Sequence, residues 1–162
     1  MKIRINGIET EVTCGETILE AARRAGIDIP TLCYSEAFGG QGVCRFCMVE
    51  IEVDGKTRLV ASCTYPITEE MEVRTNTPAV QEIRRNLVTL LYRRAPNSDL
   101  MKKLFQEYNC DRSEPLDPEE SCIMCLLCVK ACEKVGANAL SSVLRGTEKK
   151  VATPFDEESP EP

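Results

Sequence analysis

Ten cysteines and the complete absence of histidine restrict the chemistry open to this chain of 162 residues. Without His there is no Ser–His or Cys–His pair for nucleophilic catalysis, no His-bearing zinc finger and no Rieske-type centre with imidazole ligands. The first residues alternate charged side chains with isoleucine and lack the apolar stretch of a secretory signal, so a disulfide framework is not expected. We expect a cytoplasmic protein whose cysteines bind metal.

The most specific cysteine pattern lies in the C-terminal part of the chain. Its spacing, C-x2-C-x2-C-x3-C, is that of bacterial ferredoxins, in which one short loop supplies three thiolates to a [4Fe–4S] cluster. In two-cluster ferredoxins the fourth Cys of this run ligates the other cluster. Four-Cys zinc sites more often use two separated C-x2-C pairs. We therefore expect a [4Fe–4S] cluster, rather than zinc, on Cys122, Cys125, Cys128 and either Cys132 or another thiol.

A second set of cysteines has a less specific spacing. It consists of Cys33, Cys44, Cys47 and Cys63, and its first interval is ten residues instead of the four of plant-type ferredoxins. That interval contains three glycines, whose backbone can approach a sulfur-rich centre and turn N–H groups toward it. Spacing alone leaves both an iron–sulfur cluster and a zinc ion open for these four thiols.

The elements that position this second set are predicted to be short. Asn6-Gly7 and Asp54-Gly55 are strong two-residue turn signals, and Thr17 and Glu20 have the spacing of a helix capping box. Together these elements make a compact α+β unit. In order, we expect strands over 2–6 and 8–13, a helix over 17–25 that ends before Gly26, a hairpin of strands 48–53 and 58–61, and a short strand over 71–74.

The middle of the chain is predicted to be helical. Residues 79–94 carry apolar side chains at helical spacing, and residues 97–99 can cap a second helix. We interpret the basic residues of the first helix as a solvated face, with a docking surface as the alternative; they are Arg84, Arg85, Arg93 and Arg94. The predicted apolar stripe consists of Val80, Ile83, Leu87, Leu90 and Leu91.

Several stretches of the sequence resemble one group of iron–sulfur domains. These domains form the N-terminal part of [FeFe] hydrogenases, of the large iron–sulfur subunit of respiratory complex I and of NAD-dependent formate dehydrogenases. The similarity covers nearly the whole chain. It is carried by TILEAA (17–22), IPTLCY (29–34), GVCRFCMVE (42–50), ASC (61–63), CIMCLLCVKACE (122–133), RG (145–146) and VATPF (151–155).

The resemblance implies a fold and a division into domains. It implies a β-grasp ferredoxin domain over 1–77 that holds a [2Fe–2S] cluster on Cys33, Cys44, Cys47 and Cys63, which makes zinc a remote alternative. A helical connector over 78–109, a small [4Fe–4S] ferredoxin-like domain over 110–153 and an acidic tail over 154–162 would follow. The fold class is α+β.

The sequence departs from this family in two ways. Many members have a [4Fe–4S] site with one His and three Cys between the two regions, and this chain has no His and only Cys110 there. It also contains no second C-x2-C-x2-C-x3-C run, so we expect the catalytic hydrogen-cluster and molybdopterin domains to be absent. The fourth ligand of the [4Fe–4S] cluster is then Cys132 or Cys110. We interpret Cys14 as an inert apolar side chain.

Composition and motifs together favour an electron carrier. An excess of 26 acidic over 20 basic residues disfavours a nucleic-acid partner, and no apolar run approaches the ~18 residues of a membrane-spanning helix. No residue set resembles a catalytic site. By resemblance, the chain relays single electrons between a flavin-containing NAD(P)H-oxidising subunit and another redox subunit. The alternatives are a free two-cluster ferredoxin and, less favoured, a redox-sensing or zinc structural protein.

Overall fold

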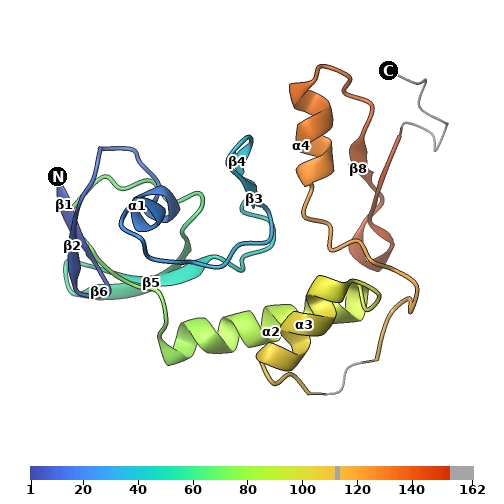
Figure 1. The fold of residues 1–162 in the computed structure, drawn as a ribbon, viewed down its shortest axis with the longest axis horizontal. Coiled ribbons are helices and arrows are strands. Elements are labelled where there is room, and N and C mark those ends of the chain that lie inside the picture. Colours follow the sequence, from blue (N-terminus) through green and yellow to red (C-terminus); the bar gives the residue numbers. More distant parts are fainter. Residues whose placement is uncertain (112–113, 154–162) are drawn as a thin grey trace.

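The computed structural model describes residues 1–111 and 114–153, so the predicted acidic tail lies outside the described residues. The N-terminal half is a five-stranded mixed sheet in the order β2-β1-β7-β5-β6 (Figure 1). β1 pairs antiparallel with β2 and parallel with β7, and β5 pairs antiparallel with both β6 and β7. The strands are β1 (Lys2–Ile5), β2 (Ile8–Glu11), β5 (Met48–Val53), β6 (Lys56–Ala61) and β7 (Glu72–Arg74).

Helix α1 (Ile18–Arg24) packs against this sheet and completes a β-grasp unit. Its buried residues share one core with the inward side chains of the strands, among them Ile5, Val49, Ile51 and Val73. The predicted capping box is confirmed, because Glu20 N–H donates to Thr17 Oγ1 at 3.3 Å and Thr17 N–H donates to Glu20 Oε2 at 2.9 Å. This cap fixes the start of the helix directly before its buried Ile18.

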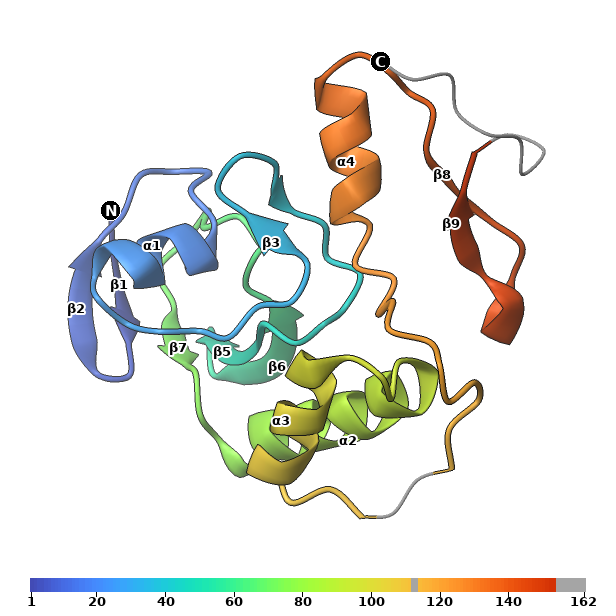
Figure 2. The same cartoon turned by 45° about the vertical axis from the view of Figure 1, so that its right-hand side comes forward.

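The two predicted hairpin turns are also confirmed. Asn6 and Gly7 have φ values of 51° and 82°, and Asp54 and Gly55 have φ values of 49° and 72°. Positive φ at both central residues matches the twist of the flanking strands, as in type I′ turns. A short antiparallel ribbon of β3 (Tyr34–Ser35) and β4 (Gly39–Gly40) was not predicted, and it lies between the sheet and the C-terminal helix (Figures 1 and 2).

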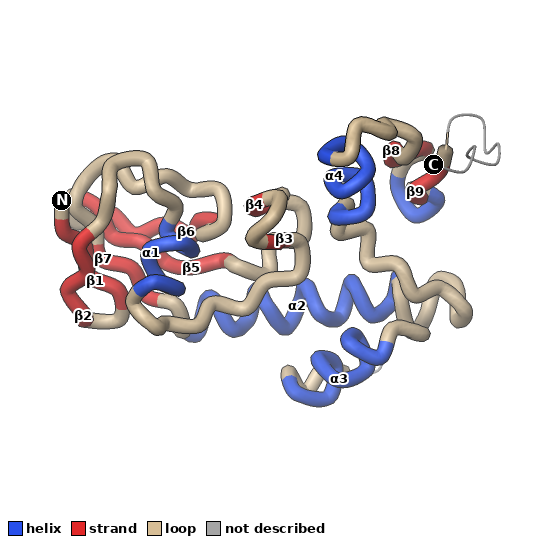
Figure 3. The backbone as a smooth tube through the Cα atoms, turned by 45° about the horizontal axis from the view of Figure 1, so that its top comes forward, coloured by secondary structure: helices blue, strands red, loops and turns tan. Residues whose placement is uncertain are grey.

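Two helices, α2 (Pro78–Arg94) and α3 (Asp99–Glu107), lie side by side below the sheet and the ribbon (Figure 3). Thr77 and Ser98 cap them through their side-chain oxygens. The predicted stripe on α2 is wrong in part, since Leu90 is 60% exposed whereas Val80, Arg84 and Val88 are the buried positions. The buried face follows an i, i+4 repeat, and this brings Arg84 to the inner side.

The C-terminal part forms a separate small lobe next to the ribbon (Figures 1 and 2). It contains α4 (Leu127–Lys134), a strand pair β8 (Ser141–Val143) and β9 (Lys150–Ala152), and a 3-10 turn over Gly146–Glu148. None of the residues of these elements is buried. This lobe therefore has no hydrophobic core of its own within the described residues.

Arginine side chains of α2 tie this lobe to the rest of the chain. The Arg94 guanidinium donates to the carbonyl oxygens of Cys122, Thr147 and Lys149. Arg93 donates to the Glu114 carbonyl. The interpretation of the α2 arginines as a solvated face is therefore wrong for buried Arg84, whereas Arg85 and Arg93 are exposed. Each of the four bonds another segment, because a long arginine side chain reaches past its own helix to acceptors on neighbouring loops.

Candidate metal centres

Four buried cysteines from distant parts of the sequence come together beside the β-grasp core. Cys33 lies in the segment before β3, Cys44 and Cys47 lie in the loop before β5, and Cys63 follows β6. All four are free thiols with exposed fractions of 1–8%. Burial of several sulfur atoms in one place suits a redox-active cluster, because the surrounding side chains keep water away from it.

The four thiols interact with one another in a chain, because Cys33 contacts Cys44 and Cys63, and Cys63 also contacts Cys47. Hydrogen bonding by the Cys44 and Cys63 thiols holds the pKa of Cys33 well below its usual range, and hydrogen bonding by Cys63 lowers the pKa of Cys47 to about 6. The pKa of Cys63 is raised because its proton is shared with Cys33 and Cys47. The pKa of Cys44 is also raised, by its hydrogen bond to Cys33 and by burial, so the thiolate, which is the form that binds iron, is favoured at Cys33 and Cys47.

Backbone N–H groups also point at these sulfur atoms. Cys44 N–H donates to Cys33 Sγ at 3.5 Å, and Phe46 N–H donates to Cys44 Sγ at 3.4 Å. Arg45 has a positive φ of 58°, which turns the following N–H back toward the Cys44 sulfur. N–H···S bonds of this type stabilise a negatively charged cluster and tune its potential.

Gly40 provides the test of whether these residues fit a cluster. A Cβ atom at this position would lie 2.5 Å from the Cys63 carbonyl oxygen and 2.8 Å from its Sγ. Only glycine allows the β4 backbone to come this close to the Cys63 sulfur. The donor set of four thiols, their burial and this close backbone approach all fit a [2Fe–2S] cluster.

The four thiols do not form a preorganised metal-coordination site in this structure. Within residues 1–111 and 114–153, no group of three or more His, Cys, Asp and Glu side chains is arranged to hold a metal ion. The assignment of Cys33, Cys44, Cys47 and Cys63 as ligands therefore stays a prediction, supported by sulfur contacts, burial and the fit at Gly40.

The second cysteine set surrounds the start of α4. Cys122 and Cys128 are exposed, and Cys125 and Cys132 are half-buried. Met124 N–H donates to Cys122 Sγ at 3.4 Å, which repeats the relation between Phe46 and Cys44. Met124 and Leu126 have positive φ values of 56° and 61°, and together they coil the backbone between the first three cysteines.

The two candidates for a fourth ligand face different neighbours. Cys132 Sγ accepts a hydrogen bond of 3.1 Å from the Ala139 N–H, within the C-terminal lobe. Cys110 is half-buried, and its Sγ lies 3.6 Å from the Arg85 carbonyl oxygen of α2. Cys132 thus already has the kind of N–H···S bond that cluster ligands receive, which favours it over Cys110.

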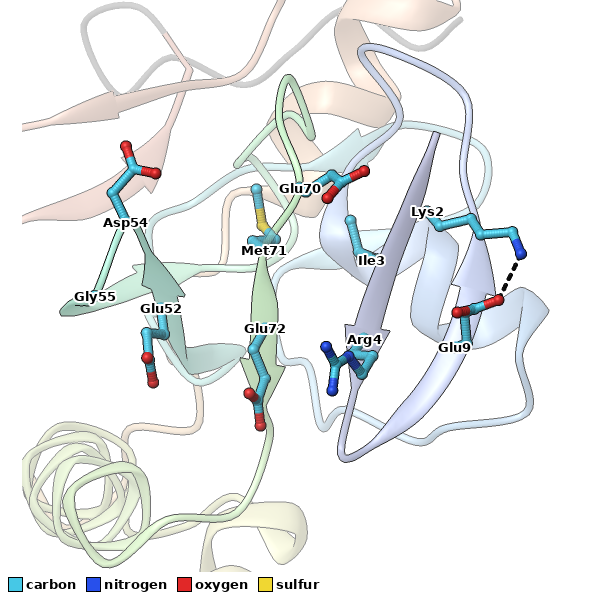
Figure 4. A pocket seen from close by; sticks show the side chains of 10 residues that line it. All are labelled: Lys2, Ile3, Arg4, Glu9, Glu52, Asp54, Gly55, Glu70, Met71 and Glu72. Carbon is cyan, nitrogen blue, oxygen red and sulfur yellow. Dashed lines mark hydrogen bonds and ion pairs between the residues drawn. The ribbon is translucent and has the colours of Figure 1, made fainter.

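Other features carry no comparable chemistry. Cys14 is exposed and follows the end of β2, so it is not buried as an apolar side chain would be; the chain turns at Gly15, which has a φ of +88°. A hollow on the sheet is lined mainly by charged side chains, including the ion pair of Lys2 and Glu9 at 2.6 Å (Figure 4). None of its lining residues is a cysteine.

Residues 1–78 match the family described as "2Fe-2S iron-sulfur cluster binding domain". None of the helices in the described residues has the length and apolar character that crossing a bilayer requires.

Curated relatives match beyond this domain. The chain is 31% identical to the NADH-ubiquinone oxidoreductase 75 kDa subunit of Reclinomonas americana, over 94% of the chain and 26% of the relative. It is 34% identical to the NADP-reducing hydrogenase subunit HndD of Solidesulfovibrio fructosivorans, over 96% of the chain and 32% of the relative. The chain thus spans less than a third of the length of these proteins, and the resemblance to complex I and hydrogenase subunits is confirmed.

A solved structure gives the same result for the fold. A chain of an NAD+-reducing [NiFe]-hydrogenase in the H2-reduced state has a TM-score of 0.80 with this structure at 26% sequence identity. The match covers 94% of this chain and 74% of that one. The arrangement of β-grasp unit, paired helices and C-terminal lobe therefore recurs in a hydrogenase component.

Proposed function

We propose that this chain is an iron–sulfur electron-transfer subunit of a multisubunit oxidoreductase and acts in the cytoplasm. It would carry a [2Fe–2S] cluster on Cys33, Cys44, Cys47 and Cys63, and a [4Fe–4S] cluster on Cys122, Cys125, Cys128 and a fourth thiolate, Cys132 or Cys110. Single electrons would pass between a flavin-containing NAD(P)H-oxidising subunit and another redox subunit. The chain itself would have no catalytic residue.

The observation that carries this proposal is the proximity of the two cysteine sets. Cys33 and Cys44 belong to a buried cluster around Phe46, and half-buried Cys125 of the second set packs against the same cluster. Lys134 of α4 reaches across to the ribbon, where its Nζ donates to the Ala37 carbonyl at 2.7 Å. Adjacent sites of this kind suit a relay, since the fold fixes how far apart the two centres are held.

The chain's own residues have three tasks in such a relay. The thiolates would hold the iron, the side chains around Phe46 keep water from the first site, and N–H groups such as that of Phe46 stabilise the charge on sulfur. When bound, the clusters supply one-electron chemistry. Each cluster would accept one electron, and the protein would not need to supply a proton in that step.

The partners are inferred from the relatives and not from a surface of this chain. The names of the relatives describe subunits of an NADH-ubiquinone oxidoreductase and of an NADP-reducing hydrogenase. A flavin is the usual group that divides the hydride of NAD(P)H into single electrons for such clusters. A subunit bearing it would deliver electrons to one of the two centres.

An anaerobic reductive titration of the full chain tests this function. We expect the wild-type protein to accept about two electrons per chain, one for each cluster. Cys47→Ser and Cys125→Ser should each remove one electron and a different spectroscopic signal. Cys14→Ser is the matched control, because Cys14 is exposed and outside both sets, and it should accept as many electrons as wild type. A wild-type chain with bound iron that accepts no electrons would contradict the proposal.

A further inference from the structure

Arg84 is a charged side chain inside the protein. It lies on α2, has an exposed fraction of 3%, and faces the loop that carries Cys44 and Cys47. Its Nε donates to the Phe46 carbonyl at 3.2 Å, and its Nη2 donates to the Met48 carbonyl at 3.0 Å. The two hydrogen bonds thus hold the residue before Cys47 and the residue after it.

Among the described residues, no carboxylate is in ion-pair contact with the Arg84 guanidinium. The ion pairs formed by the described residues, 1–111 and 114–153, do not include Arg84, whereas its neighbour Arg85 pairs with Asp111 and Arg74 pairs with three glutamates. A buried cation without an anion is strongly disfavoured, because it loses its hydration without compensation. The carbonyl oxygens of Phe46 and Met48 accept hydrogen bonds from only two of the five N–H groups of the guanidinium.

The surroundings of Arg84 indicate where its counter-charge lies. Burial lowers the pKa of Arg84, and the Tyr108 and Cys47 side chains oppose this most strongly, with a weaker contribution from Asp28. Tyr108 packs edge-on against Phe46 with ring centroids 5.6 Å apart, and its phenol interacts with the Arg84 guanidinium on this side of the loop. Among these three acidic groups, Cys47 is the one whose neighbours in the chain, Phe46 and Met48, both accept a hydrogen bond from Arg84.

We propose that Arg84 is a positioning residue of the [2Fe–2S] site, which fixes the Cys47 loop and supplies a buried positive charge to the anionic cluster. This inference rests on the proposed function, because it requires the cluster on Cys33, Cys44, Cys47 and Cys63. The cluster with four thiolates is negatively charged, and its charge becomes more negative on reduction. A fixed cation nearby therefore stabilises the reduced form more than the oxidised form.

The test is an EPR-monitored redox titration of the [2Fe–2S] signal in the full chain. Arg84→Met keeps much of the side-chain volume and removes the charge, and it should make the cluster at least tenfold harder to reduce, a shift of about 59 mV to lower potential. Arg84→Lys keeps the charge and should recover most of the wild-type potential. Arg85→Met removes an equal charge from the exposed side of the same helix and should shift the reduction equilibrium less than threefold.

A second readout concerns folding. In the protein without iron, Arg84 is an uncompensated buried charge, so Arg84→Met should destabilise the iron-loaded form more than the iron-free form in urea unfolding. If Arg84→Met takes up no cluster, recovery of the cluster in Arg84→Lys supports the inference, and failure of both variants overturns it.

The inference also fails if Arg84→Met and Arg85→Met have the same potential. It fails likewise if Arg84→Met holds an intact cluster at the wild-type potential. Absence of a [2Fe–2S] cluster from the wild-type chain would instead overturn the proposed function itself.

Discussion

Replacement of Gly40 by alanine tests the first cluster site most closely. The added methyl group would lie 2.5 Å from the carbonyl oxygen, 2.7 Å from Cβ and 2.8 Å from Sγ of Cys63. Non-bonded carbon atoms prefer separations of about 3.5–4.0 Å, so β4 or Cys63 would have to move by roughly 1 Å. Gly40 is not among the residues with positive φ, so contact with Cys63 alone makes the position intolerant.

This displacement predicts two effects. Overpacking of this kind lowers the free energy of unfolding by about 1–3 kcal/mol. Metal–ligand distances tolerate changes of only about 0.2 Å, so moving Cys63 should remove its thiolate from the ligand set. We expect Gly40→Ala to weaken retention of the [2Fe–2S] cluster by about 10–100-fold, the range for residues that orient metal ligands.

Gly39→Ala is the matched control for this variant. Gly39 has a φ of +70° and no atom within 4 Å of an added Cβ, so the substitution strains the backbone by about 1–2 kcal/mol without touching Cys63. Both variants should be prepared anaerobically and compared by iron content, visible circular dichroism and urea unfolding. Loss of the cluster in Gly39→Ala to the same extent, or a full cluster in Gly40→Ala, would refute the role assigned to the close approach.

Three further predictions concern the rest of the chain. Cys132→Ser should remove the [4Fe–4S] signal and Cys110→Ser should leave it, because Cys132 Sγ already accepts the Ala139 N–H; the reverse result would assign Cys110. Thr17→Ala removes the helix cap and should lower the unfolding free energy by about 1 kcal/mol, whereas Thr13→Ala, on the exposed preceding turn, should not. Removal of iron should speed hydrogen exchange in the C-terminal lobe more than in β5, because none of the residues in the lobe's helices and strands is buried; equal exchange before and after removal would contradict this.

The sequence predicts the local structure of the N-terminal half well. Asn6-Gly7, Asp54-Gly55 and the Thr17–Glu20 pair each contain their own short-range signal, and each has the expected conformation. Parallel pairing of β1 with β7 joins strands about 70 residues apart in the sequence, and no local signal specifies it. Spacing was specific for the C-terminal cysteine set, whereas the [2Fe–2S] assignment of Cys33, Cys44, Cys47 and Cys63 also needed the resemblance to a known family.

Arg84 shows why helix patterns mislead near a charged site. The apolar periodicity of α2 predicts that its arginines are solvated, and the burial of Arg84 breaks that rule. The repeat Val80–Arg84–Val88 at i, i+4 was the available signal, but an arginine between two valines normally indicates a solvent-facing position. Burial here depends on the Phe46 and Met48 carbonyls, which the chain brings to α2 only when it folds.

Iron and acid-labile sulfide per chain, measured on anaerobically prepared protein with EPR of the dithionite-reduced sample at two temperatures, test the central claim most directly. The account predicts about six irons, a slowly relaxing [2Fe–2S] signal and a second signal visible only at very low temperature. Zinc in place of iron, or about two irons with no fast-relaxing signal, would contradict a two-cluster relay in this chain.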